Sequence, residues 1–381
     1  MIRTSKIRGN LLLPDRNPAF GSISIEGGVI ARIDIESTEA RSGFDLIAPG
    51  FIDAHVHGGG GADVMDASPG AIDAVTATHA RHGTTSMLAS TVSAPPDEIG
   101  GAIDRIRRYR DKGGRSVVGI HLEGPFLNPA QRGAMKPDYI IPPDTKLLLD
   151  WVERGEGLVK MITLAPEVDG AEELIAEART KGIVVSAGHS MASWEDMERA
   201  EPKGVRHLTH LFNAMRALGH HEPGLIGYAL RHGGMSMDFI ADGHHLHPAI
   251  VDMLITLAGP ERLMLVTDAM RAAGLGDGEY ESAGLRVSVS DGIARIGNGS
   301  LAGSLLTMDE AFSRIVRVHG RSLAEASLMA SANPAKLLGL ERSKGSIALG
   351  KDADIVCLSP EGAVTRTIID GDDVWPIRSA E

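Results

Sequence analysis

The stretch PGFIDAHVHGGGG, residues 49–61, holds the first strand and the first candidate ligands of the predicted fold. Its apolar run, residues 50–54, predicts a short buried strand, and His55 and His57 follow that run directly. Side chains two residues apart on an extended strand point the same way, so the two imidazoles can converge on one point. The glycines that follow allow the backbone to lie close to whatever is bound there. The stretch therefore indicates half of a metal site.

Further apolar runs of this kind alternate along the chain with segments of helical spacing. The strand candidates are residues 50–54, 84–89, 117–122, 159–164, 183–187, 205–209, 236–241 and 263–267. The helical segments are residues 70–82, 97–111, 170–181, 193–200 and 249–258. Such alternation implies parallel strands with right-handed crossovers. The pattern predicts an α/β fold of the (β/α)8 TIM-barrel type, and no G-x-G-x-x-G follows the first strand to favour a doubly wound, dinucleotide-binding sheet.

Both ends of the chain show the alternating polar and apolar pattern of β-strands. Residues 22–33 have the pattern of a hairpin with a Gly-Gly turn. The C-terminal segments of the same type are residues 345–347, 353–358 and 364–369. We therefore expect a small β-sandwich domain formed by both termini, residues 1–49 and 346–381, beside a central barrel of residues 50–345.

The composition is that of an ordinary globular protein, with 43% apolar and 23% charged residues in a chain of 381. The single cysteine, Cys357, permits no internal disulfide, and the first ten residues lack the apolar run of a signal peptide. We therefore expect a cytoplasmic protein. No apolar run reaches the roughly 18 residues that a membrane span needs. The net charge of −12 argues against nucleic acid as a partner.

Candidate site residues follow the ends of the predicted strands, where the catalytic groups of a (β/α)8 barrel lie. In chain order they are His55, His57, Glu123, His189, His210, His244, His245 and Asp268. Each one alone could be an ordinary loop residue or a hydrogen-bonded core residue. Their common placement indicates a single site. Imidazole and carboxylate ligands suit zinc, iron, cobalt or manganese, and a lone cysteine excludes a thiolate site.

Ten motifs, in this order, resemble those of the N-acetylglucosamine-6-phosphate deacetylases of the amidohydrolase superfamily. They are PGFIDAHVHG, GIHLEGPFLNP, TLAPE, SAGHS, THLFNAM, EPGLIG, DGHH, LVTDAM, LAGS with the following LTM, and NPAKLLGL with GSIALGKDADIV. The resemblance covers essentially the whole chain. It implies a metal-dependent amide hydrolase with a (β/α)8 barrel, a small β domain from both termini, and a homodimer.

The resemblance also assigns the metal ligands. It makes Glu123, His189 and His210 the ligands of the metal that this family retains. His55 and His57 match the superfamily pair that can hold a second ion. We therefore expect one or two divalent ions per subunit, with zinc favoured and iron, cobalt or manganese as alternatives.

A proton carrier is needed as well, because the amine of an amide is a poor leaving group. The resemblance gives this role to Asp268, which would take a proton from water and pass it to the departing nitrogen. A helix N-cap is the alternative role of this aspartate. Many amidohydrolases bridge two metals through a carboxylated lysine at the end of the fourth strand. Here Lys160 lies at the beginning of that strand, so no lysine bridge is expected.

Substrate contacts implied by the resemblance are Asn213 and Ala214 for a phosphate and His245 for the sugar. Two further contacts depart from the family pattern. Met135 occupies the place of a histidine near the acetyl carbonyl, and a thioether donates no strong hydrogen bond. His221 occupies the place of an arginine that pairs with phosphate, and a neutral imidazole lacks the bidentate grip of a guanidinium. Arg132, Lys136 and Arg216 are alternative cationic partners.

The function that the resemblance implies is deacetylation of N-acetylglucosamine 6-phosphate to glucosamine 6-phosphate and acetate. Because of the two departures, N-acetylgalactosamine 6-phosphate and unphosphorylated N-acetyl hexosamines stay open as substrates. A cyclic-amide hydrolase is disfavoured by the missing lysine and by the HLEGP and FNAM motifs. A non-catalytic sugar-binding module is disfavoured because every expected ligand and Asp268 are present.

Overall fold

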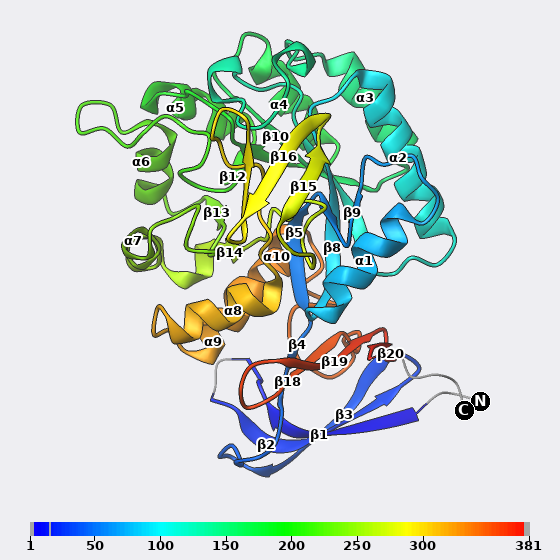
Figure 1. The fold of residues 1–381 in the computed structure, drawn as a ribbon. Coiled ribbons are helices and arrows are strands. Elements are labelled where there is room, and N and C mark those ends of the chain that lie inside the picture. Colours follow the sequence, from blue (N-terminus) through cyan, green and yellow to red (C-terminus); the bar gives the residue numbers. More distant parts are fainter. Residues whose placement is uncertain (1–3, 15–16, 377–381) are drawn as a thin grey trace.

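The computed structural model describes residues 4–14 and 17–376, which form a large barrel and a smaller sheet below it (Figure 1). The barrel contains eight parallel strands, each hydrogen-bonded to the next in chain order. They are β5 (Phe51–Val56), β8 (Thr84–Thr91), β9 (Val117–Glu123), β10 (Val159–Leu164), β11 (Val184–Ala187), β12 (Val205–Leu208), β13 (Ser236–Phe239) and β14 (Leu263–Leu265). The predicted strands and the (β/α)8 architecture are confirmed.

The barrel closes between its last and first strands, at the end where the candidate site residues lie. The Asp268 N–H donates to the His55 carbonyl at 2.9 Å, and the His57 N–H donates to the Ala269 carbonyl at 3.0 Å. These bonds continue the parallel pairing just beyond β14. The residues that close the barrel are therefore themselves candidate ligands or their neighbours.

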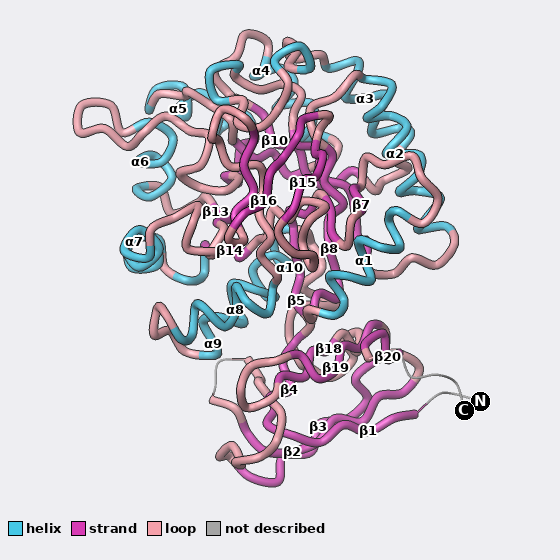
Figure 2. Tube along the Cα trace, viewed as in Figure 1, coloured by secondary structure: helices cyan, strands magenta, loops and turns pink. Residues whose placement is uncertain are grey.

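Helices cover the outside of the barrel (Figure 2). They are α1 (Ala71–Arg81), α2 (Pro96–Asp111), α3 (Thr145–Arg154), α4 (Ala171–Thr180), α5 (Trp194–Lys203), α6 (Gly224–Arg231), α7 (Pro248–Ala258) and α8 (Met308–Arg317). The five helices predicted from spacing are confirmed, whereas α3, α6 and α8 were not predicted. Short α9 (Leu323–Ser327), a π-helical turn (Leu328–Ala332) and α10 (Asn333–Leu337) follow. There Asn333 Nδ2 donates to the Leu263 carbonyl at 2.7 Å and ties this segment to β14.

A three-stranded antiparallel sheet lies over the mouth of the barrel, between β14 and α8 (Figure 1). Its strands are β15 (Gly278–Ser282), β16 (Leu285–Ser290) and β17 (Ile293–Ile296). A smaller hairpin of β6 (Gly58–Gly59) and β7 (Ala62–Asp63) follows His57. Neither sheet was predicted, and both lie beside the candidate site.

The two termini together build the second sheet, as expected. Its seven strands run in the order β20, β19, β18, β4, β1, β2, β3. Their bounds are β1 (Thr4–Leu11), β2 (Ala19–Glu26), β3 (Val29–Ser37), β4 (Leu46–Pro49), β18 (Ile355–Leu358), β19 (Val364–Ile369) and β20 (Asp372–Trp375). Both halves share one apolar core that includes Ile23, Ile47 and Ile355. The N-terminal and C-terminal strands of the expected sandwich are thus joined through β4 in one sheet. Residues 345–347, which were predicted to be β-structure, form no strand.

Within the described ranges, none of the helices is both long and apolar enough to cross a membrane.

Lys344 lies where the small sheet meets the barrel. Its Nζ is 2.5 Å from Asp354 Oδ2 and 3.1 Å from Asp352 Oδ2. The Asp354 carbonyl accepts the Gly50 N–H at 2.9 Å, immediately before β5. The largely buried ammonium therefore neutralises the carboxylate of a residue whose backbone connects the two parts of the chain.

We expect Lys344→Met to destabilise the protein by about 3–5 kcal/mol, because it leaves the buried Asp354 carboxylate without its counter-charge. The measurement is the melting temperature, which should fall by several degrees. Lys336→Met is the matched control, since Lys336 is exposed on α10. Equal melting temperatures of the two variants would contradict the role given to Lys344.

Candidate active site

Six strand-end side chains converge inside the mouth of the barrel. They form two groups in which the ligand atoms lie within 4.8 Å of one another: His55, His57 and Asp268 in one, and Glu123, His189 and His210 in the other. The first group comes from the ends of β5 and β14, and the second from the ends of β9, β11 and β12. The structure thus brings together residues that span more than half of the chain.

Glu123 lies between the two groups. Its Oε1 is 3.2 Å from the Nε2 atoms of both His189 and His210, and 3.3 Å from His55 Nε2. Its other oxygen, Oε2, is 3.2 Å from His57 Nε2. One carboxylate can therefore serve two adjacent cation positions.

The hydrogen bonds behind the imidazoles fit metal ligation. His57 Nδ1 donates to the Ser90 carbonyl at 3.1 Å, and His189 Nδ1 donates to the Gln131 carbonyl at 2.8 Å. A ring that donates through Nδ1 keeps its Nε2 lone pair, the atom that a metal takes, directed into the site. His55 and His210 also direct Nε2 at the cluster. Four imidazole nitrogens and two carboxylates are the donor set that suits zinc and related divalent ions.

Several of these side chains depend on unusual backbone conformations. His189, His210 and Asp268 have φ angles of 48°, 33° and 49°. Such left-handed conformations are unfavourable for residues other than glycine and persist only where surrounding contacts hold them. Asp238 provides the contact that holds the backbone of His210, because this buried carboxylate accepts the His210 N–H. The same carboxylate also accepts a hydrogen bond from His207 Nε2 at 2.9 Å.

In the cluster, burial and nearby opposite charges shift the pKa values in opposite directions. Burial alone would raise the pKa of the Glu123 carboxyl, but the nearby imidazoles, His55 foremost, outweigh it and hold that pKa well below its usual value. The pKa of Asp268 is likewise lowered, since His55 and His57 outweigh its burial. Burial alone would lower the pKa of His57, yet Asp268 and Glu123 raise it well above the usual value, so a metal ion that takes the Nε2 lone pair displaces a proton from this ring. Both carboxylates are therefore ionised, as ligands and proton acceptors must be.

His79, on α1, supports the glycine stretch that follows His57. Its Nε2 donates to the Gly58 carbonyl at 2.9 Å, while its buried Nδ1 has no hydrogen-bond partner among the described residues. Burial lowers the pKa of this imidazole to about 4. His79 is therefore neutral at physiological pH.

We expect His79 to make the protein acid-sensitive. The His79 ring takes up a proton near pH 6.5 in the unfolded chain but only near pH 4 in the folded chain. The stability that the neutral ring contributes is therefore fully present above pH 6.5 and is lost as the pH falls toward 4. His79→Gln keeps an N–H donor and does not titrate. Its melting temperature should fall less than that of the wild type between about pH 7.5 and pH 5. Parallel curves would contradict this, and exposed His220→Gln is the control.

A cavity of about 490 Å³ opens above the cluster. Met135, Asn213, Ala214 and His245, four of the predicted substrate contacts, line it. The fifth, His221, is exposed on the loop before α6 and is not among the lining residues. The structure therefore does not bring His221 to the cavity.

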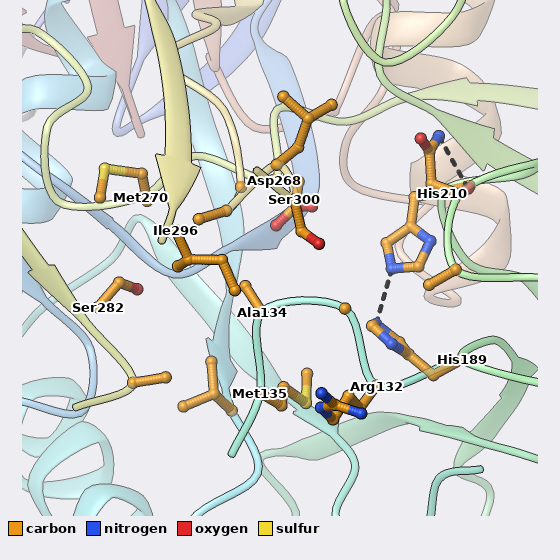
Figure 3. A pocket seen from close by; sticks show the side chains of 18 of the residues that line it. Arg132, Ala134, Met135, His189, His210, Asp268, Met270, Ser282, Ile296 and Ser300 are labelled. Atoms are coloured by element: carbon orange, nitrogen blue, oxygen red, sulfur yellow. Dashed lines mark hydrogen bonds between the residues drawn. The ribbon is translucent and has the colours of Figure 1, made fainter. Parts of the chain in front are cut away.

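The opposite wall of the cavity comes from residues that the sequence analysis missed. Figure 3 shows His189 and His210 facing each other on one side and Met270, Ser282 and Ile296 on the other. The last two belong to the inserted three-stranded sheet. Its signal is present in residues 285–296, LRVSVSDGIARI, where alternating apolar residues flank an Asp-Gly turn. Arg132 is the one arginine or lysine among the described residues that line the cavity.

Comparison with known proteins agrees with this geometry. A family model described as "Amidohydrolase family" matches residues 46–374. The chain belongs to the amidohydrolase family. This match and the deacetylase relatives together confirm the resemblance seen in the sequence motifs. This amidohydrolase is a hydrolytic enzyme that acts on carbon–nitrogen amide bonds, with residue groups able to hold a divalent metal.

Individual relatives match nearly the full length of this amidohydrolase. An N-acetylglucosamine-6-phosphate deacetylase of Bacillus subtilis (strain 168) is 38% identical over 373 residues, covering 95% of this chain and 94% of the relative. An N-acetylgalactosamine-6-phosphate deacetylase of Escherichia coli O157:H7 is 38% identical over 352 residues, covering 92% and 93%. A solved mutant N-acetyl-D-glucosamine-6-phosphate deacetylase from Mycobacterium smegmatis, in complex with N-acetyl-D-glucosamine-6-phosphate, has a TM-score of 0.91 and 33% identity, covering 97% and 99%.

Proposed function

We propose that this amidohydrolase is a metal-dependent deacetylase that converts N-acetylglucosamine 6-phosphate to glucosamine 6-phosphate and acetate. The observation that carries the proposal is the convergence of four imidazoles, Glu123 and Asp268 beneath one cavity. The relative from Bacillus subtilis and the solved structure from Mycobacterium smegmatis, both named for this substrate, support it.

The proposed ligands are Glu123, His189 and His210 for one ion and His55 and His57, with Glu123 shared, for a second. Zinc is the proposed metal because the donors are imidazole and carboxylate without thiolate. When bound there, a divalent ion supplies hydroxide near neutral pH, by lowering the pKa of water toward about 7, and polarises the amide carbonyl.

The chain's own residues then handle the proton. Asp268, whose Oδ1 is 3.3 Å from His57 Nε2, is the proposed acceptor of the proton from water. The water oxygen forms a bond to the carbonyl carbon, the carbon–nitrogen bond breaks, and Asp268 returns the proton to the amine nitrogen. The products are the free amino sugar and acetate.

Substrate orientation is proposed to depend on the polar rim of the cavity. Asn213 and Ala214 are the proposed phosphate contacts and His245 the sugar contact. His245 is held by Asp242, whose Oδ2 accepts from Nδ1 at 2.7 Å. Because His221 lies outside the cavity, Arg132 is the cation that we propose for the substrate phosphate.

A second substrate has specific support. The relative from Escherichia coli O157:H7, named for N-acetylgalactosamine 6-phosphate, has the same 38% identity as the one from Bacillus subtilis. The two sugars differ only in the orientation of one hydroxyl group. The galactosamine compound is therefore the proposed alternative.

The test is acetate release from a panel of the two phosphorylated N-acetyl hexosamines and their unphosphorylated forms, measured with zinc-loaded enzyme. We expect the highest kcat/KM for N-acetylglucosamine 6-phosphate. A higher value for the galactosamine compound would move the assignment to that sugar, and no release from any member would refute the deacetylase proposal.

We also propose the compartment of the enzyme, its oligomeric state and its domain bounds. The enzyme is a cytoplasmic homodimer, which cell fractionation and analytical ultracentrifugation would test. The small domain comprises residues 1–49 and 346–381, and the catalytic barrel comprises residues 50–345.

A further inference from the structure

Glu167, at the carboxyl end of β10, joins three of the loops that form the site. Its Oε1 accepts the Met191 N–H at 2.6 Å and Asn128 Nδ2 at 2.9 Å. Its Oε2 accepts the Ser190 hydroxyl at 2.7 Å. The donors follow β9 and β11, so one half-buried carboxylate connects the ends of three neighbouring strands. It is not among the residues that line the cavity.

These bonds hold both the backbone of His189 and the turn that contacts its ring. Ser190 and Met191 follow His189 directly, and the Asn128 N–H donates to the His189 carbonyl at 3.0 Å. Asn128 also begins the short turn that ends at Gln131, because its Oδ1 accepts the Ala130 N–H at 2.9 Å. The Gln131 carbonyl is the acceptor for His189 Nδ1. Glu167 therefore secures the backbone of His189 and the turn that orients its ring.

The same carboxylate secures the proposed phosphate contacts. The Ser190 N–H donates to the Ala214 carbonyl at 3.1 Å, and the Arg216 N–H donates to the Ser190 carbonyl at 3.0 Å. Arg216 Nε donates in addition to the Met191 carbonyl at 2.8 Å. The segment that carries Asn213 and Ala214 thus pairs with the two residues that Glu167 holds.

We propose that Glu167 is a positioning residue that fixes the His189 imidazole and the Asn213–Ala214 segment as one unit. His189 needs such support because its φ of 48° is unfavourable for a non-glycine residue. A carboxylate suits the role because both of its oxygens accept hydrogen bonds, and the three donors require an acceptor on each side. The part of the inference that concerns substrate rests on the proposed function, whereas the part that concerns His189 does not.

The test compares Glu167→Gln, Ser190→Ala and the double variant. A glutamine offers one oxygen and turns an NH2 group toward one of the donors, so at least one bond is lost. We expect Glu167→Gln to weaken zinc binding by about 10–100-fold, measured by competition with a chelator, and to raise KM for the phosphorylated sugar. Ser190→Ala should have a smaller effect in the same direction, and the double variant should bind zinc about as weakly as Glu167→Gln alone.

The control is Glu173→Gln, an exposed glutamate on α4, which should change neither quantity. Unchanged zinc affinity in Glu167→Gln, or additive effects in the double variant, would overturn the proposal and leave Glu167 a merely structural residue. If Glu167→Gln does not fold, unchanged zinc affinity in Ser190→Ala would overturn it instead. If the enzyme hydrolyses no N-acetyl sugar, the proposed function fails, yet the zinc affinities still decide the role of Glu167.

Discussion

Asp268→Asn is expected to lower kcat by about 10²–10⁴-fold while the protein stays folded and retains most of its metal. Asparagine has nearly the same shape and tolerates the left-handed φ of 49° found here. Its amide, however, cannot take a proton from water or return one to the leaving nitrogen. Asp268 is not a member of the group formed by Glu123, His189 and His210, so metal held by those three residues should stay bound.

The measurement combines steady-state acetate release with metal analysis of the same preparation. Asp291→Asn is the matched control, since Asp291 also has a left-handed φ of 52° but is exposed in the turn between β16 and β17. It should leave kcat unchanged. Near-normal turnover of Asp268→Asn with full metal content would show that another group carries the proton.

The barrel could be predicted because its strands are short and apolar. Parallel strands covered by helices on one side and by the barrel core on the other are buried on both faces. All residues of β5 and β8 are indeed buried, although five of the eight residues of β8 are serine or threonine. The helix α8 was missed although Met308, Ala311, Phe312 and Ile315 are its buried residues and have clear helical spacing. By contrast α6 has only eight residues, which is too few for periodicity to identify it.

The residues of the candidate site could be predicted because they lie at strand ends, but their arrangement in space could not. Chain order places Glu123 at the end of β9, His189 after β11 and His210 after β12, and the barrel topology then brings them together. The shared position of Glu123 between two groups and the left-handed backbone of His189 depend on loop contacts. Those contacts join residues far apart in the chain, such as Asn128 with Glu167, and local sequence patterns carry no information about them.

The inserted sheet over the mouth of the barrel shows a different limit of prediction from sequence. Its Asp-Gly turn and alternating residues predict a hairpin, yet they do not say that the hairpin will lie over the barrel. Val287 and Ile296 reach the cavity because they pack with Met270, which follows β14 at the site itself. The wall of a binding cavity is in this way set by tertiary packing rather than by the local pattern.

Replacing His55 and His57 together by asparagine is expected to remove about one equivalent of metal per subunit and to spare the other. Each of the two rings directs Nε2 at Glu123, 3.3 Å away for His55 and 3.2 Å for His57. Glu123 Oε1 is also 3.2 Å from the Nε2 atoms of both His189 and His210, and that set needs neither member of the pair. Metal counted by mass spectrometry in wild type and variant tests this directly.

The control for the double variant is His121→Asn. The His121 ring centroid is 4.6 Å from that of His55, but its Nδ1 bonds Ser90 Oγ at 3.0 Å and its Nε2 bonds Thr163 Oγ1 at 2.8 Å. With both nitrogens engaged, His121 is a structural neighbour rather than a ligand, so its loss should leave the metal content unchanged. If the double variant loses all metal while His121→Asn keeps it, His55 and His57 hold the ion on which the whole site depends, and the independent set of Glu123, His189 and His210 is refuted.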